Sequence, residues 1–86
     1  MTDEFVINYI NEKIENSQDK NYIRYTFYEL RVKNNLDEDE VDRFLEINKN
    51  YFENKGYNVF FTGAKFTYKS AKITVQPNEL MIAIKK

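Results

Sequence analysis

The chain has 86 residues, of which 42% are hydrophobic and 16% aromatic, so it can form a single domain (1–86) with one modest core. It contains no Cys and no His, which removes disulfides, thiolate metal sites and the commonest general base. Residues 1–56 carry 8 Lys/Arg and 13 Asp/Glu (net −5), and residues 57–86 carry 5 and 1 (net +4), so one part is acidic and the other basic. No apolar run approaches the roughly 18 residues of a membrane span, and the acidic start MTDEFV is unlike a secretory signal. We therefore expect a cytoplasmic protein with no membrane partner.

Residues 2–16 are predicted to form the first helix. Thr2 can cap its N-terminus, and Asp3 and Glu4 lie where the helix dipole favours negative charge. Apolar side chains then recur at helical spacing, at Val6, Ile7, Ile10 and Ile14. The polar segment SQDKN at 17–21 is predicted to be a loop.

The next stretch, YTFYELRV at 25–32, has features of both a strand and a helix. Its Tyr, Thr, Phe and Val residues favour a strand. Thr26 and Glu29, however, have the spacing of a capping box, and Tyr25 and Leu30 have the spacing of a hydrophobic staple. We predict a short strand at 22–25 followed by a short helix at about 27–34. A continuous strand over 22–33 is the alternative.

The same helix-start signature recurs in NNLDEDEV. Asp37 is the predicted N-cap, Glu40 its capping-box partner, and Leu36 and Val41 the staple. The apolar pattern continues to Phe52, and Gly56 is a favoured residue just beyond a helix end. A long helix is therefore predicted over about 38–55, and the short link before it predicts a helix-turn-helix pair.

After Gly56 the apolar pattern changes to the period of two that strands show. The predicted strands of a C-terminal antiparallel hairpin or wing are 57–61, 64–69, 73–75 and 79–85. In the last of them, Leu80, Ile82 and Ile84 are predicted to point inward.

The order of these elements is that of a winged-helix domain. The segment YTFYELRVKNNLDEDEVDRFLEINKNYFENKGYNVFFTG resembles the helix-turn-helix and first wing strand of small winged-helix proteins of bacteria and their phages. The GY-x-V after the long helix and the return strand NELMIAIKK fit the same scheme, so the resemblance covers about residues 22–86. It implies an α+β fold of three helices (2–16, 27–34, 38–55) and a wing at 62–78. The competing fold is a generic α+β domain with three or four antiparallel strands and two helices.

Catalytic chemistry has few candidates here, and we predict no enzyme, no metal and no cofactor. The one dense acidic group is D-E-D-E-x-D at 37–42, whose oxygens would suit Mg²⁺ or Ca²⁺. The spacing and Gly of a Ca²⁺ loop are absent. Acidic residues that begin a helix, where the dipole favours them, are the preferred explanation.

The winged-helix resemblance implies DNA binding, with the second helix of the pair in the major groove. The acidic start of that helix would meet DNA phosphates with like charge, which argues against insertion there. The wing offers a different contact, because its lysines are interleaved with aromatic residues that can stack on bases. These residues are Lys65, Lys69, Lys72, Phe66 and Tyr68. A half-buried strand explains the same alternation and is the simpler interpretation.

The exposed side of the long helix suits contact with a protein. Its acidic residues are Glu38, Asp39, Asp42 and Glu46, and they could dock on a basic surface. A plain solvated helix face is the simpler interpretation. The leading hypothesis is a non-catalytic regulatory or accessory protein of phage or mobile-element origin that acts by protein contact, with a homodimer as one arrangement. The alternative is a DNA-binding regulator that uses the basic wing.

Overall fold

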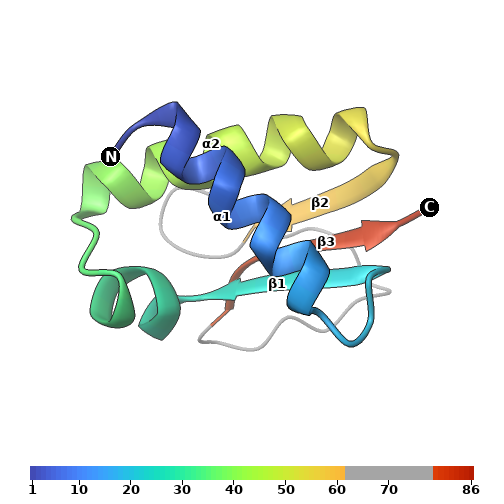
Figure 1. The fold of residues 1–86 in the computed structure, drawn as a ribbon, viewed down its shortest axis with the longest axis horizontal. Helices are drawn as coiled ribbons and strands as arrows, with labels where there is room; N and C mark the ends of the chain where they lie inside the picture. The colour runs from blue at the N-terminus through green and yellow to red at the C-terminus, as the bar shows by residue number, and fades with distance from the viewer. Residues whose placement is uncertain (62–78) are drawn as a thin grey trace.

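The computed structural model describes residues 1–61 and 79–86 and shows an α+β fold (Figure 1). Three helices and a three-stranded antiparallel sheet make up this part of the chain. In chain order the elements are α1 (Asp3–Asn16), β1 (Tyr22–Thr26), η1 (Tyr28–Lys33), α2 (Glu38–Asn54), β2 (Tyr57–Phe61) and β3 (Glu79–Lys85). The expected strands at 64–69 and 73–75 lie outside the described residues.

Helix α1 begins as its sequence predicts. The Thr2 hydroxyl accepts a hydrogen bond from the Phe5 N–H at 3.1 Å, which satisfies one of the unpaired donors of the first turn. Val6 and Ile10 are fully buried, while the predicted core residue Ile7 is 37% exposed. The helix ends at Asn16. The ammonium of Lys20 donates hydrogen bonds to the carbonyl groups of Ile14 and Glu15 in the last turn.

The change from strand to helix inside YTFYELRV is confirmed, because β1 ends at Thr26 and η1 begins at Tyr28. The helix is a π-helix, a wider form than the expected α-helix. The Thr26 hydroxyl accepts from the Glu29 N–H at 3.2 Å, as in a capping box. The Glu29 carboxylate bonds to α1, so the predicted reciprocal bond to Thr26 is replaced. Residues Tyr25 and Leu30, the predicted staple, are both fully buried.

Helix α2 carries the complete form of the same signature. The Asp37 carboxylate accepts from the Glu40 N–H at 2.8 Å, and the Glu40 carboxylate accepts from the Asp37 N–H at 3.1 Å. The helix ends next to Gly56, whose φ of +88° is the left-handed conformation that glycine adopts without strain. Both helix boundaries therefore agree with the sequence prediction.

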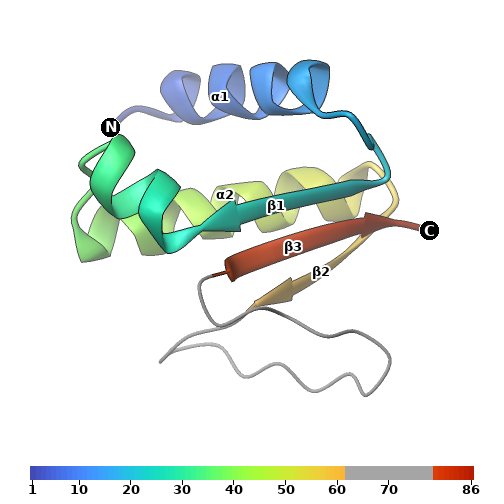
Figure 2. The same cartoon turned by 90° about the horizontal axis from the view of Figure 1, so that it is seen from below.

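The sheet is more than the predicted C-terminal hairpin, because β1 from the first half of the chain is also part of it. The strand order is β1-β3-β2, with β3 in the centre and both pairings antiparallel. Figure 2 shows β3 between the other two strands. The final strand needs two partners to satisfy the backbone groups on both of its sides, and the chain supplies one from each half.

The inward face of β3 is opposite to the predicted one at Ile82 and Ile84, whereas Leu80 packs against the core as predicted. Met81 and Ala83 pair with the core residues Tyr25 and Ile23, so these four side chains face α1 and α2. Ile82, which was predicted to point inward with Leu80 and Ile84, pairs with exposed Arg24 and lies on the opposite face, where it is also fully buried. Both residue sets of β3 are apolar, so its alternation alone cannot choose between the faces.

The core lies between the sheet and the two α-helices, which pack on the same side of it (Figures 1 and 2). Its large fully buried side chains include Tyr25, Phe44, Phe52, Ile10 and Leu30. Within the described ranges, no helix is both long and apolar enough to cross a membrane.

Candidate functional site

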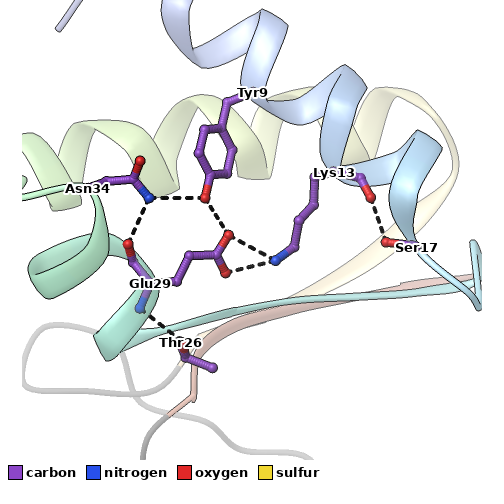
Figure 3. A network of polar contacts seen from close by, with 6 residues as sticks. All are labelled: Tyr9, Lys13, Ser17, Thr26, Glu29 and Asn34. Carbon is purple, nitrogen blue, oxygen red and sulfur yellow. Dashed lines mark hydrogen bonds and ion pairs between the residues drawn. The ribbon is translucent and has the colours of Figure 1, made fainter.

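Polar side chains from α1 and η1 meet in one cluster, which Figure 3 shows. The Tyr9 hydroxyl donates a hydrogen bond to one carboxylate oxygen of Glu29. The ammonium of Lys13, one turn further along α1, lies 2.7 and 3.0 Å from the two oxygens of the same carboxylate. The side chains of Lys13 and Glu29 are only 24% and 18% exposed, so water screens the pair less than it would a surface pair.

Asn34 connects this cluster to the wide turn of η1. Its amide Nδ2 donates to the Tyr9 hydroxyl at 3.1 Å and to the Glu29 carbonyl at 2.8 Å. The backbone N–H of Asn34 donates to the same Glu29 carbonyl at 3.1 Å, five residues back, which is the bond of a π-helix. The cluster therefore stabilises the π-helical form of η1 and links η1 to α1 through hydrogen bonds.

The protonation state of the tyrosines favours a structural role for the cluster. Burial, followed by the hydrogen bond to the Glu29 carboxylate, holds the pKa of Tyr9 well above its ordinary value of 10.0. Tyr9 thus stays a neutral donor at physiological pH. Burial likewise raises the pKa of Tyr25. The Lys13 ammonium lies 4.9 Å from the centre of the Tyr25 ring. Both tyrosines contact Phe44 edge-on, which continues the cluster into the core.

An open pocket of about 460 Å³ lies beside the cluster, between α1 and η1. Besides the cluster itself, its lining includes Glu12, Asn16, Ser17 and Lys33. Two lysines and two glutamates balance the charge of the lining, and Lys13 and Glu29 already neutralise each other. The pocket therefore has no net charge with which to select an anion or a cation.

The acidic residues predicted for α2 lie on its outer side. Glu38, Asp39 and Glu46 are exposed and Asp42 is half-buried. Because Glu38, Asp42 and Glu46 are four residues apart, they follow one row along the helix. We call Glu38, Asp39, Asp42 and Glu46 the acidic ridge.

The basic residues of α2 do not pair with Glu38, Asp39 or Glu46 of this ridge. Arg43 pairs with Asp3 of α1, and Lys49 lies 3.7 Å from Glu53, further along the helix. No ion pair within residues 1–61 and 79–86 involves Glu38, Asp39 or Glu46. In that same part of the chain, no three carboxylates come together as a metal site, including those of residues 37–42.

The predicted wing contacts lie outside the described residues. They are Lys65, Lys69, Lys72, Phe66 and Tyr68.

Sequence reasoning missed two surfaces. The first is the Tyr9–Lys13–Glu29–Asn34 cluster, where Glu29 was assigned to a local cap. The second is the outer side of η1, where Phe27, Tyr28 and Val32 are 50%, 64% and 57% exposed. The i, i+4 spacing of Tyr28 and Val32 around buried Leu30 was the available signal, since it places them away from Leu30 on a helix.

Comparison with protein families, with curated proteins and with solved structures finds no match to this chain. Functional conclusions therefore rest on the geometry and charge described above.

Proposed function

We propose that this chain is a non-catalytic, winged-helix-like accessory or regulatory protein of phage or mobile-element origin. It acts by contacting a basic surface of another protein through the acidic ridge of α2. The order of elements, α1-β1-η1-α2-β2-β3, supports the resemblance to winged-helix proteins.

The observation that carries the proposal is that three carboxylates of the ridge, Glu38, Asp39 and Glu46, make no ion pair within the described residues. Glu38, Asp39 and Glu46 are exposed, and the arginine of the same helix is turned toward Asp3 of α1. Exposed carboxylates in a row accelerate encounter with a basic partner and discourage contact with phosphates. This is the opposite of the charge that a helix needs in the major groove of DNA.

To test the proposal, the tagged chain is purified from its host together with the protein that it binds. The purified partner is then titrated with the chain at several salt concentrations. Asp39→Lys with Glu46→Lys should weaken binding at least about tenfold and reduce its salt dependence. Glu4→Lys with Glu15→Lys is the matched control, because it changes the net charge equally at exposed positions of α1. Equal losses in both double variants, or no loss in either, would contradict the role of the ridge.

A further inference from the structure

The outer edge of β1 carries unpaired backbone groups. Among the described strands, β1 has β3 as its only neighbour. The Asn21 carbonyl accepts from the Lys85 N–H at 2.8 Å, so the backbone groups of Asn21 face β3. This orientation alternates along an antiparallel strand, so Ile23 and Tyr25 also face β3, whereas the N–H and C=O of Arg24 point away from it. No hydrogen bond in the described part of the chain involves those two groups of Arg24.

Two open hollows follow this edge of the sheet. The pocket of about 460 Å³ lies between α1 and η1, and a second one of about 410 Å³ lies between the end of α1 and β1. Lys13 and Ser17 line both hollows, and Tyr22 and Arg24 of β1 line the second. The last turns of α1 cross over β1 and reach past the edge of the sheet (Figure 1). We call the two adjoining hollows and the strand edge beside them the β1 groove.

The lining of the β1 groove suits the amide groups of a peptide. Lys13 is paired with Glu29, and Arg24 is paired with Glu79 at 3.2 Å, so these charges already have partners. The other lining charges are of both signs. Side chains that both donate and accept hydrogen bonds complete the lining: Asn16, Ser17, Gln18 and Asn34. Such a groove recognises a main chain and does not select a charged ligand.

The backbone of Arg24 calls for an extended segment as the occupant. An added strand presents one C=O and one N–H to the two groups of a single edge residue, which is the pattern of strand addition to a sheet. A second copy of this chain would bring its own β1 to the edge. A two-fold axis at Arg24 would then set the two Arg24 side chains directly opposite each other, and like charges so placed destabilise a strand pair.

We propose that the β1 groove binds an extended peptide segment of another protein, which pairs with β1 as a fourth strand of the sheet. The N–H and C=O of Arg24 form the central hydrogen bonds of this pairing. Asn16 and Asn34 bond to peptide amide groups across the groove. No residue of the acidic ridge takes part, so this inference is independent of the proposed function.

A peptide selected for binding provides the probe. Random peptides of about ten residues, roughly twice the length of β1, are displayed on phage and selected against the immobilised full chain, and the enriched peptide is synthesised. In nuclear magnetic resonance spectra of the full chain, hydrogen exchange of the Arg24 amide should slow at least about tenfold when this peptide is added. Without the peptide, the exchange rate should not depend on protein concentration.

Two matched variants test the position of the peptide. Glu12 lines the groove, whereas Glu15 is exposed on α1 outside its lining. Glu12→Trp should obstruct the groove and weaken peptide binding at least about tenfold, and Glu15→Trp should leave it within about twofold. Far-ultraviolet circular dichroism confirms that both variants are folded.

Methylation of single peptide amides tests the pairing itself. Because alternate residues of a strand face its neighbour, methylation should abolish binding at every second position and leave it nearly unchanged at the positions between. Failure to enrich any peptide, an unchanged exchange rate at Arg24, equal effects of the two tryptophan variants, or methylation effects without alternation would each overturn the proposal. Protection of the Arg24 amide that grows with protein concentration alone would assign the edge to a second copy of the chain, which also overturns it.

Discussion

Tyr9 of α1 donates its hydroxyl to the carboxylate of Glu29, twenty residues further along the chain in η1. A second tyrosine, Tyr25, lies nearby with ring centres 6.2 Å apart, but its buried hydroxyl has no hydrogen-bond partner in the described part of the chain. Two neighbouring tyrosines thus differ in whether the hydroxyl is satisfied, which makes the same substitution informative at both positions.

We expect Tyr9→Phe and Tyr25→Phe to have opposite effects on stability. Tyr9→Phe removes a hydrogen bond to a charged group and should lower the free energy of unfolding by about 2 kcal/mol. Tyr25→Phe removes an unsatisfied buried hydroxyl and should raise it by about 1 kcal/mol. In a domain of this size each kcal/mol shifts the melting temperature by roughly 4–8 °C, which calorimetry resolves. A loss in Tyr25→Phe would contradict the unsatisfied state of its hydroxyl, and the absence of a loss in Tyr9→Phe would contradict the bond from Tyr9 to Glu29.

Glu29→Gln should lower the free energy of unfolding by about 1–2 kcal/mol. The amide keeps the shape of the side chain but removes the charge that Lys13 neutralises in a half-buried position. Glu12→Gln on the exposed side of α1 is the control, and we expect it to change stability by less than about 0.5 kcal/mol. Urea unfolding monitored by circular dichroism measures both, and equal effects would show that the Lys13–Glu29 pair contributes nothing specific.

Asp37→Ala should destabilise the chain by about 1 kcal/mol, because it removes the N-cap of α2. Asp39→Ala removes the same charge from the same helix end without breaking a capping bond, so only the favourable interaction with the dipole is lost. Its expected cost is about 0.3–0.5 kcal/mol. Urea unfolding of both variants at one salt concentration measures the difference in free energy of unfolding, which is the contribution of the capping hydrogen bond. Equal free energies of unfolding would mean that only the loss of charge matters.

Alkaline pH should unfold the protein through its buried tyrosines. Burial raises the pKa of Tyr9, Tyr22 and Tyr25 above the ordinary value of 10.0. Below that value both states keep the protons, and the stabilisation is fully present. As the pH rises further, the unfolded chain loses these protons first, so the free energy of unfolding falls until the folded state also ionises. Urea midpoints at pH 9 and pH 11 measure the fall, and Tyr25→Phe should show a smaller one. An identical fall in that variant would mean that Tyr25 does not contribute.

Duplex and single-stranded DNA should show no mobility shift with this protein at low salt, because the exposed face of α2 is acidic. The DNA-binding alternative makes the opposite prediction. It requires a shift that weakens and loses salt dependence when Lys65→Ala, Lys69→Ala and Lys72→Ala are combined. The assay therefore decides between protein contact and nucleic-acid contact.

The signals that predicted the helices correctly are local in the chain. Thr2 and Asp37 each accept from an N–H three residues ahead, and Gly56 follows Lys55, the C-cap of α2. Such contacts form within one helical turn, so the pattern of neighbouring residues is sufficient to locate them. The boundary between β1 and η1 was predictable for the same reason, since the Thr26 hydroxyl caps the Glu29 N–H.

Contacts between distant segments were not predictable in this way. Glu29 had the spacing of a capping residue, but the stronger partners Tyr9 and Lys13 come from another helix. In β3, both alternating sets are apolar, and only pairing with Ile23 and Tyr25 determined that Met81 and Ala83 face the helices.

The sequence by itself predicted, to within one residue, where each described helix and strand begins and ends, and it determined that the long helix has an acidic start. Only the tertiary structure decided the strand order β1-β3-β2, the inward face of β3, the partners of Glu29 and the exposure of Phe27, Tyr28 and Val32. The physical reason is the range of the interactions. Capping and turn formation join residues a few positions apart, whereas burial and charge pairing depend on which distant segments meet in the folded chain.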